Sequence, residues 1–330
     1  MRAPEPIVEI VATGRYLPER VVTNEELSKT VDTSDEWIRE RTGIRERRIA
    51  PAEMGAADMA ANAARIAMDR AGIHAGELDL IVLSTATPDR LLPSTACDLQ
   101  ALLGATNAAA LDVSAACTGF IYAMSMAEGY IAAGRGELAL VVSTEKMSAI
   151  VDWGDRATCV LFGDGAGAAI VRKATNGRGV ISSFIRSDGT LAELLWRPGG
   201  GAKIPMDIAV LDEKNHLVKM AGREVFKAAV RSMAESADQA LLRAGLTGPD
   251  IDLFVPHQAN MRIIESTAKY ANVPMDKVFV NVDRYGNMSS ATLPVALDEA
   301  LEHGRIKPGD HVMMVAFGAG FTWGSMVVKW

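Results

Sequence analysis

Two stretches of the sequence resemble each other: residues 71–86 read AGIHAGELDLIVLSTA, and residues 244–259 read AGLTGPDIDLFVPHQA. They align without gaps at an offset of 244 − 71 = 173 residues. The same offset places GELALVV (136–142) on GDHVMMV (309–315), since 309 − 136 = 173. Two matches at one offset indicate an internal repeat, so we predict two halves of similar topology.

Within each half, strands alternate with helices, which predicts βαβ units and mostly parallel sheets. Continuous apolar runs such as Leu80–Leu83 predict sheets covered on both faces. The expected elements are strands near 80–83, 108–113, 138–144, 278–283 and 311–317, and helices near 118–133 and 289–303. The prediction is an α/β fold with two pseudo-symmetric βαβ halves and a five-layered α/β/α/β/α core. We expect a boundary near 172–180, dividing the chain into residues 1–175 and 176–330, and an irregular insertion at 187–216.

Composition limits the classes of function. The chain has 330 residues, 49% of them hydrophobic, and a net charge of −7, which disfavours a nucleic-acid binder. Its 3 cysteines have no metal-type spacing and form no disulfide framework, which fits a reducing, cytoplasmic compartment. The N-terminus lacks an apolar signal core, and the uncharged stretch between His311 and Lys329 fits a glycine-turned strand pair better than a membrane insertion.

Cys117 is the first candidate for chemistry. It follows an apolar strand ending at Asp112-Val113 and precedes Thr118-Gly119 and an apolar helix. A thiol at a helix N-terminus has a lowered pKa, because the helix dipole favours the thiolate. The layout therefore predicts a nucleophile. The structural alternative is a small buried apolar residue, and we assign that role to Cys97, in a helical pattern, and to Cys159, in an apparent strand.

His257 and Asn287 stand at two further strand ends. The apolar segment Phe254–Pro256 delivers His257 to the end of a strand, where open α/β sheets place their ligands. Adding 173 to 117 gives 290, so the Asn287 loop is the counterpart of the Cys117 turn. Each residue alone also fits a structural role, but the repeat allows all three to meet.

Two segments are rich in glycine. Phe162–Ala169 contains GxGxG but leads into a strand, which argues against a dinucleotide loop that must open a helix. Ala316–Gly324 follows an apolar strand, and backbone N–H groups in such a turn can form an oxyanion hole.

Six segments in order resemble the β-ketoacyl-[acyl-carrier-protein] synthase III family, which has a thiolase-like fold. They are EWIRERTGI (36–44), AACTG (115–119), FGDGAG (162–167), PHQAN (256–260), GNMS (286–289) and FGAGFTWG (317–324). Segment 316–320 lacks the second cysteine of degradative thiolases, and Asn287 stands where elongating ketosynthases have a second histidine. The resemblance therefore implies the initiating condensing enzyme of bacterial type II fatty acid synthesis.

The resemblance also implies the chemistry. Cys117 takes an acyl group from acyl-CoA, and its N–H and that of Ala319 hold the thioester oxygen. His257 and Asn287 donate hydrogen bonds to the thioester carbonyl of malonyl-acyl-carrier protein as CO₂ leaves. The family usually has a third glycine at position 319, but the alanine retains its N–H. The coenzyme A thioester is a substrate, and no metal or cofactor is required.

Binding residues follow from the same resemblance. Coenzyme A is expected at Trp37, Arg41 and Arg156. Leu92 is expected in the acyl pocket, contributed across a homodimer interface, and its size leaves room for branched or medium primers. Docking of the acidic carrier protein is expected at Lys227, Gln258, Ala259, Asn260, Met261, Arg262 and Lys269.

Three other functions stay open. They are a related ketosynthase of secondary metabolism with another acceptor or primer, a Cys-His-Asn hydrolase, and a non-catalytic binding scaffold in which Cys117 is inert. Substrate assays separate the first. Free fatty acid as the main product would favour the hydrolase. Lack of an acyl adduct on Cys117 would favour the binding scaffold.

Overall fold

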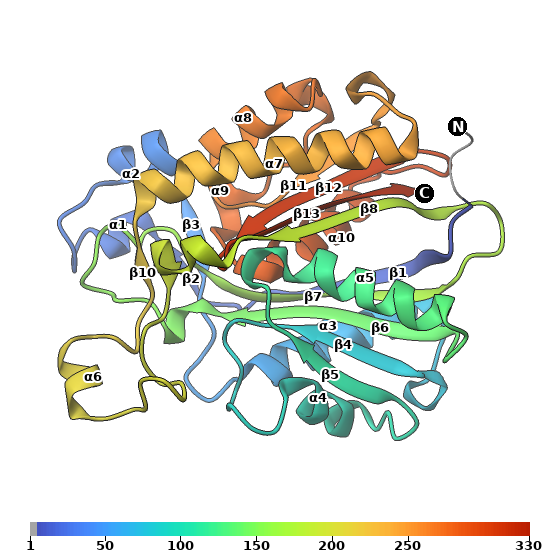
Figure 1. Cartoon of the computed structure of the whole chain (residues 1–330). Coiled ribbons are helices and arrows are strands. Elements are labelled where there is room, and N and C mark those ends of the chain that lie inside the picture. Colours follow the sequence, from blue (N-terminus) through green and yellow to red (C-terminus); the bar gives the residue numbers. More distant parts are fainter. Residues whose placement is uncertain (1–4) are drawn as a thin grey trace.

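Two β-sheets form the framework of the computed structural model, which describes residues 5–330 (Figure 1). The first sheet has the order β1-β7-β6-β4-β5, with β1 (Val8–Tyr16), β7 (Asp164–Lys173), β6 (Leu138–Lys146), β4 (Leu80–Ser84) and β5 (Ala109–Val113). The second has the order β11-β12-β13-β8, with β11 (Leu253–Pro256), β12 (His311–Gly318), β13 (Thr322–Lys329) and β8 (Gly179–Ser187). Each sheet thus draws its strands from one half of the chain.

The repeat relates the two sheets strand by strand. β4 begins at Leu80 and β11 at Leu253, and 80 + 173 = 253. β6 begins at Leu138 and β12 at His311, and 138 + 173 = 311. The order β4-β6-β7-β1 in the first sheet matches β11-β12-β13-β8 in the second. The predicted pair of similar halves is confirmed.

Helices complete the five layers. Two lie between the sheets, α5 (Gly119–Ala132) and α10 (Thr292–Glu302). Four cover the outer faces: α3 (Ala56–Ala71) and α4 (Thr95–Leu103) on the first sheet, and α7 (Gly222–Ala244) and α8 (Met261–Tyr270) on the second. The sequence of α5, GFIYAMSMAEGYIA, carries a single charge, as expected of a helix enclosed between two sheets.

The apolar core has a central part and two outer parts. The central part joins both halves, because Phe120 of α5, Leu253 of β11 and Leu293 of α10 belong to the same cluster of buried side chains. In the first half, the outer face of the sheet packs on the alanine-rich side of α3. In the second half, α7 and α8 cover the corresponding face.

Both sheets are mixed, so the expectation of mostly parallel sheets is wrong. β4 pairs in parallel with β5 and β6, and β11 with β12. The pairs β6–β7, β1–β7, β12–β13 and β8–β13 are antiparallel. The reason is that β12 turns back directly into β13, and β6 returns as β7 through residues 147–163 without a crossover helix.

The strand predicted at 278–283 does not form. A single bridge joins Val278 to Phe254, and the chain then enters α9 (Val282–Tyr285). Gln258 explains the difference, because its Oε1 accepts the N–H groups of Asn281 and Val282, at 3.0 Å and 3.2 Å. The side-chain amide of Gln258 thus accepts the N–H groups that a strand would pair with the carbonyl groups of a neighbouring strand.

Other predicted elements shift slightly. The helices expected at 118–133 and 289–303 correspond to α5 and α10, and the 3₁₀ turn Ser289–Ala291 precedes α10. Cys159 lies in a buried turn, so its assignment to a strand is wrong. Cys97 lies in α4 as expected but is exposed, so its assignment to a buried role is wrong. The insertion at 187–216 holds only short elements. The further 3₁₀ turns are Ala75–Glu77, Ala116–Thr118, Met147–Ala149, Gly189–Leu194, Gly248–Asp250 and Met275–Lys277.

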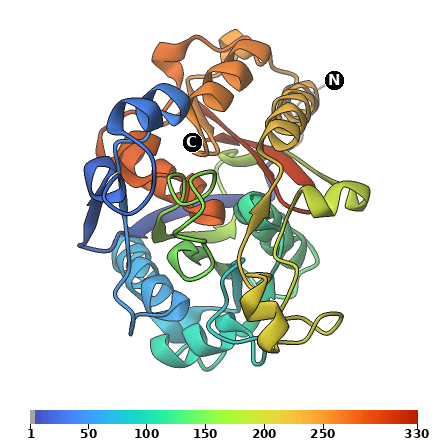
Figure 2. The same cartoon turned by 90° about the vertical axis from the view of Figure 1, so that its left-hand side faces the viewer.

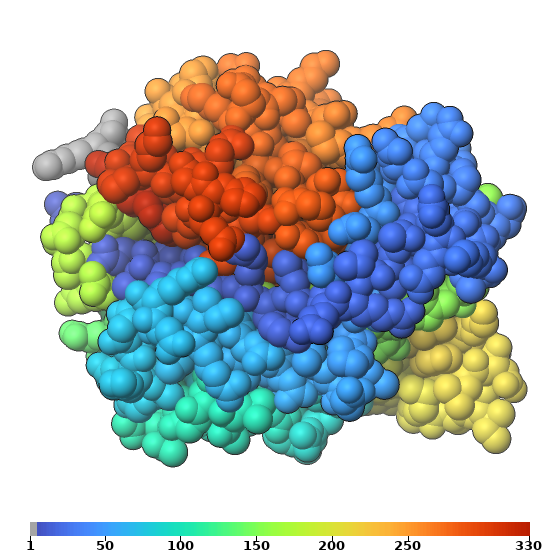
Figure 3. All heavy atoms as spheres, turned by 180° about the vertical axis from the view of Figure 1, so that it is seen from behind, coloured from blue at the N-terminus to red at the C-terminus, as the bar shows by residue number. Residues whose placement is uncertain are grey.

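Several short elements lie at one end of the layered core, on the left of Figure 1 and facing the viewer in Figure 2. They are β2 (Val21–Thr23), α1 (Asn24–Leu27), α2 (Asp35–Thr42), β3 (Glu46–Arg48), β9 (Leu195–Trp196), α6 (Ile208–Asp212) and β10 (Lys219–Met220). The segment around α6 projects beyond the layers (Figure 3).

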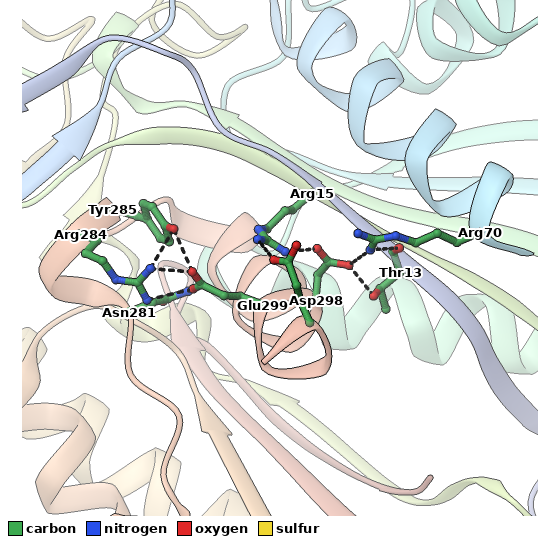
Figure 4. A network of polar contacts seen from close by, with 9 residues as sticks. Thr13, Arg15, Arg70, Asn281, Arg284, Tyr285, Asp298 and Glu299 are labelled. Atoms are coloured by element: carbon green, nitrogen blue, oxygen red, sulfur yellow. Dashed lines mark hydrogen bonds and ion pairs between the residues drawn. The ribbon is translucent and has the colours of Figure 1, made fainter. Parts of the chain in front are cut away.

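Two neighbouring carboxylates fix α10 in place (Figure 4). Asp298 is fully buried and accepts from Thr13 Oγ1 at 2.6 Å, Arg15 at 2.5 Å and Arg70 at 2.5 Å, all from the first half. Glu299 accepts instead from three residues of the second half, Asn281, Arg284 and Tyr285. α10 is therefore anchored to both halves, and its N-terminus points to the site described next.

Candidate active site

Cys117 lies in the short turn between β5 and α5. The preceding residue, Ala116, has a φ of 44°, a left-handed conformation that costs a non-glycine residue about 1–3 kcal/mol. The turn places the thiol two residues before the first residue of α5, and the residue is only 7% exposed. The predicted strand–turn–helix setting of Cys117 is confirmed.

The protonation of Cys117 differs from the expectation. Burial raises the pKa of the thiol to about 12, and the nearby Glu145 carboxylate also raises it. The rise from 9.0 corresponds to about 4 kcal/mol, whereas a helix N-terminus typically contributes ~0.3–1 kcal/mol in the opposite direction. Burial therefore outweighs the helix dipole, and the sulfur carries its proton at neutral pH.

His257 follows β11 directly. Its N–H donates to the carbonyl of Val315 at 2.8 Å, which holds the backbone against β12. The imidazole Nδ1 lies 2.6 Å from Oγ1 of Thr292, the first residue of α10. Burial lowers the pKa of His257 to about 3, so the ring is neutral across the physiological range.

Asn287 is held by its backbone and by one end of its side chain. Its N–H donates to Leu161 at 2.8 Å, and its carbonyl accepts from Gly163 at 3.1 Å. The side-chain Oδ1 accepts the N–H of Ser289 at 2.8 Å. Because the oxygen is used in this way, the donor end of the amide, Nδ2, is the end available to a bound group.

One cavity brings the three residues together. It has a volume of about 130 Å³, and Cys117, His257 and Asn287 all contribute to its wall. The Sγ of Cys117 lies 3.6 Å from Oγ of Ser289, two residues beyond Asn287. The remaining lining is mostly apolar: Leu161, Phe162, Leu195, Met220, Gly222, Val225, Phe226, Ala229, Met233, Ala259, Asn260, Ile263 and Phe317.

The glycine turn after β12 approaches Cys117 closely. A Cβ added to Gly318 would lie 2.6 Å from the backbone N of Cys117 and 3.2 Å from its Cα, so only glycine fits there. Ala319 follows as the first residue of the turn between β12 and β13. The two segments from which the oxyanion donors were predicted are therefore in contact.

Trp37, Arg41 and Arg156 also come together. The guanidinium carbon of Arg41 lies 4.8 Å from the centre of the Trp37 ring, and that of Arg156 lies 5.0 Å from it. Asn260 connects this cluster with the cavity, because its side chain lines the cavity and donates to the carbonyl of Arg41 at 3.0 Å. An aromatic face with two cations thus lies near the cavity wall.

The predicted docking residues separate into two groups. Lys227, Arg262 and Lys269 are exposed on α7 and α8. Gln258 is fully buried and bonded to the backbone of Pro256, Phe279, Asn281 and Val282, so its assignment to a docking surface is wrong. Ala259 and Asn260 line the cavity, and Met261 is half-buried at the start of α8.

Leu92 lies away from the cavity. Its side chain is 86% exposed, and it is absent from the cavity wall. Within one chain, therefore, Leu92 does not shape the space around Cys117.

Sequence reasoning missed several residues of the site. Gly222, Val225, Phe226, Ala229 and Met233 form one wall of the cavity, and their spacing along α7 is that of one helix face, a signal present in the sequence. Ser289 and Thr292 contact Cys117 and His257, and Glu145 accepts from Ser290 Oγ at 2.6 Å. Ser289 ends the GNMS segment (286–289), but no local pattern marks Thr292 or Glu145.

Within the described residues, 5–330, no group of three or more His, Cys, Asp or Glu side chains is arranged to hold a metal ion. Over the same range, the helices are too short or too polar to cross a membrane.

The fold and the site together define a class. Two pseudo-symmetric halves around a five-layered core, with a cysteine, a histidine and an asparagine meeting at one cavity, make this a thiolase-like enzyme with a Cys-His-Asn site.

Comparisons with known proteins identify the family within that class. Family models of 3-oxoacyl-[acyl-carrier-protein] synthase III match residues 111–189, and those of its C-terminal part match residues 241–330. The β-ketoacyl-[acyl-carrier-protein] synthase III of Symbiobacterium thermophilum is 51% identical over 323 residues, covering 98% of each chain. The chain belongs to the β-ketoacyl-[acyl-carrier-protein] synthase III family, and it is a condensing enzyme of the acyltransferase type.

Solved structures agree with this assignment. The 3-oxoacyl-[acyl-carrier-protein] synthase III from Aquifex aeolicus has a TM-score of 0.91 and 46% identity, covering 98% of this chain and 100% of that one. The priming β-ketosynthase of the R1128 polyketide pathway also has a TM-score of 0.91, with 36% identity over 100% of this chain and 98% of that one.

Proposed function

We propose that the protein joins an acyl group from acyl-CoA to malonyl-acyl-carrier protein and so initiates type II fatty acid synthesis. One observation carries this proposal: Cys117, His257 and Asn287, from three separate segments of the chain, line a single cavity. A nucleophile and two hydrogen-bond donors around one apolar space suit a reaction with a covalent intermediate and a developing oxyanion.

In the first step, the sulfur of Cys117 attacks the thioester carbonyl of acyl-CoA. The C–S bond to coenzyme A breaks, and the proton of the thiol ends on the departing sulfur. The N–H groups of Cys117 and Ala319 stabilise the oxyanion, which the contact between Gly318 and Cys117 supports.

In the second step, malonyl-acyl-carrier protein loses CO₂. The electron pair of the broken C–C bond forms an enolate, and His257 and Asn287 donate hydrogen bonds to its oxygen. The enolate carbon then attacks the acyl carbonyl, and the bond to Cys117 breaks to release the 3-oxoacyl product. The thiolate regains a proton from water. These steps use the chain's own residues and need no metal or organic cofactor.

Substrate binding follows the same proposal. Trp37 stacks on the adenine of coenzyme A, and Arg41 and Arg156 pair with its phosphates. The exposed cations Lys227, Arg262 and Lys269 form the docking surface for the acidic carrier protein.

The active assembly is a homodimer. β5 pairs with β4 along one edge only, and Leu111 on it is 40% exposed, so the strand is an apolar sheet edge that a second copy would cover. Leu91 and Leu92 are 79% and 86% exposed, which fits a role of Leu92 in the acyl pocket of the other copy.

Within each chain, residues 1–175 form the half with the nucleophile, and residues 176–330 form the half with the histidine and asparagine. The 3 unpaired cysteines fit the cytoplasm.

The test is intact-protein mass spectrometry after exposure to acyl-CoA. We expect an acyl adduct on the wild type and on Cys97→Ser, a matched control at an exposed cysteine, and none on Cys117→Ser. Malonyl-acyl-carrier protein should then discharge the adduct into 3-oxoacyl-acyl-carrier protein with release of CO₂. An adduct that persists in Cys117→Ser would move the nucleophile elsewhere. Release of free fatty acid would favour a hydrolase. Lack of any acyl adduct on the protein would favour a binding scaffold.

A second candidate is a priming ketosynthase of secondary metabolism, favoured by the likeness to the R1128 enzyme. The same site would serve it. A panel of acyl-CoA primers and carrier proteins separates the two, because each function has its own preferred pair.

A further inference from the structure

The imidazole of His257 has a single hydrogen-bond partner for its ring among residues 5–330, the hydroxyl of Thr292. Nδ1 and Oγ1 are 2.6 Å apart, and both side chains are buried. The other ring nitrogen, Nε2, is therefore the atom that His257 can present to the cavity it lines. A neutral imidazole carries one proton, so the partner of Nδ1 decides whether Nε2 donates or accepts.

The hydroxyl of Thr292 has one proton and two acceptors within reach. Nδ1 of His257 lies at 2.6 Å and the carbonyl oxygen of Ser289 at 3.0 Å. The Ser289 carbonyl already accepts the backbone N–H of Thr292. Nδ1 has no other donor among the described residues. Because the Ser289 carbonyl already has a donor, the hydroxyl proton is available to Nδ1.

The repeat shows that this contact is specific to one half. The counterparts of His257 and Thr292 are Ser84 and Gly119, since 257 − 173 = 84 and 292 − 173 = 119. A Cβ added to Gly119 would lie 1.7 Å from Oγ of Ser84, so the two positions are in contact there as well. Only in the second half are they occupied by a ring and a hydroxyl that hydrogen-bond.

We propose that Thr292 is a positioning residue: its hydroxyl donates to Nδ1 of His257 and so keeps the ring proton on Nε2, which faces the cavity. This inference rests on the proposed role of His257 as a hydrogen-bond donor during decarboxylation. Thr292 itself touches no reacting atom.

The assignment separates the two chemical steps. With its proton on Nε2, His257 stabilises the enolate oxygen but has no lone pair there to take the proton of Cys117. That proton passes to the sulfur of coenzyme A as it leaves. Acylation therefore depends on His257 less than decarboxylation does.

Nitrogen NMR of ¹⁵N-histidine-labelled protein tests the inference directly, because the two neutral tautomers have different ring nitrogen shifts. The chain has 5 histidines, and comparison with His257→Gln identifies the signals of this ring. We expect the wild type to carry its proton on Nε2. A proton on Nδ1 overturns the inference, whatever the stability of the variants.

Kinetics of three variants supply the second test. Thr292→Val removes the hydroxyl that donates to Nδ1, so the ring proton is no longer held on Nε2. We expect the rate of decarboxylation to fall by about 10- to 100-fold, the loss seen when the hydrogen-bond partner of a metal-bound histidine is removed. Acylation of Cys117 should stay close to the wild-type rate. Thr292→Ser keeps the hydroxyl and should restore decarboxylation. Thr267→Val is the matched control, because the Thr267 hydroxyl is also buried in a helix but bonds to the carbonyl of Ile263.

The outcomes are distinct. Equal loss of acylation and decarboxylation in Thr292→Val, or no loss of either, overturns the inference. If His257→Gln decarboxylates normally, the proposed role of His257 fails, and the inference fails with it. If His257→Gln is defective but the wild-type ring carries its proton on Nδ1, only the inference about Thr292 fails.

Discussion

Replacing Asn287 by aspartate isolates the donor end of this side chain. In the wild type, Oδ1 accepts the N–H of Ser289 at 2.8 Å, and an aspartate oxygen can do the same. What the substitution removes is the pair of N–H donors on Nδ2. We therefore expect the loop to keep its conformation while the enolate loses one donor.

The expected loss is large. Removing one donor from an oxyanion site typically costs ~10²–10³ in rate, about 2.7–4 kcal/mol of barrier. The new carboxylate adds repulsion, so decarboxylation should fall by at least this factor. Asn287→Ala should lose decarboxylation similarly, but it also leaves the Ser289 N–H without its acceptor, which costs about 1–3 kcal/mol of folding stability.

The assay measures both steps on one sample. Mass spectrometry reports acylation of Cys117 by acyl-CoA, and ¹⁴CO₂ release from labelled malonyl-acyl-carrier protein reports decarboxylation. Both Asn287 variants should be acylated, and neither should release CO₂ efficiently. Asn107→Asp makes the same chemical change at an exposed position and should behave as the wild type. If Asn287→Asp blocks acylation as fully as Cys117→Ser, Asn287 is a structural residue of the loop and the assignment of two steps is refuted.

Four further predictions follow from the geometry. Gly318→Ala places a Cβ 2.6 Å from the backbone N of Cys117, so acylation by acyl-CoA should fall sharply in rapid-quench assays; an unchanged rate would mean that the turn moves freely. Glu145→Gln removes a charge that raises the pKa of Cys117, so the midpoint of thiol alkylation should move to lower pH, and a constant midpoint would contradict this. Asp298→Asn removes the buried carboxylate that pairs with the partly exposed Arg15 and Arg70, and the free energy of unfolding in urea should fall by about 1–3 kcal/mol; a loss near zero would mean that the cluster contributes little. Leu92→Phe should narrow primer choice toward acetyl-CoA in a primer panel, and an unchanged profile would place Leu92 outside the acyl pocket of either copy.

The sequence was sufficient for those parts of the fold that depend on local pattern. The repeat predicted β4 and β11, β6 and β12, and the strand-end positions of Cys117 and His257, because apolar runs and their spacing are properties of the chain itself. It was insufficient where a distant group decides the outcome. The strand expected at 278–283 is absent because the amide of Gln258 takes the N–H groups of that segment.

The electrostatics of the site were beyond the sequence for the same reason. A helix start suggested a low thiol pKa for Cys117, but the second half of the chain covers the turn, and the resulting burial raises the pKa instead. Likewise, nothing near Thr292 in the sequence shows that its hydroxyl meets His257, 35 residues away. A contact between the halves decides the first property, and a contact within the second half, between the end of β11 and the start of α10, decides the second.

The left-handed residue before Cys117, Ala116, has a counterpart in the second half of the repeat. Ser289 has a φ of 47°, close to the 44° of Ala116, and 116 + 173 = 289. Each central helix is thus entered through the same tight turn, but the residue after the second turn, Ser290, is fully buried and bonded to Glu145 across the interface between the halves. The first turn places Cys117 at the wall of the cavity, while the second joins the two halves through the hydrogen bond from Ser290 to Glu145. Because the backbone conformation is alike at both turns, the side chains placed on each turn determine which of them carries the candidate nucleophile.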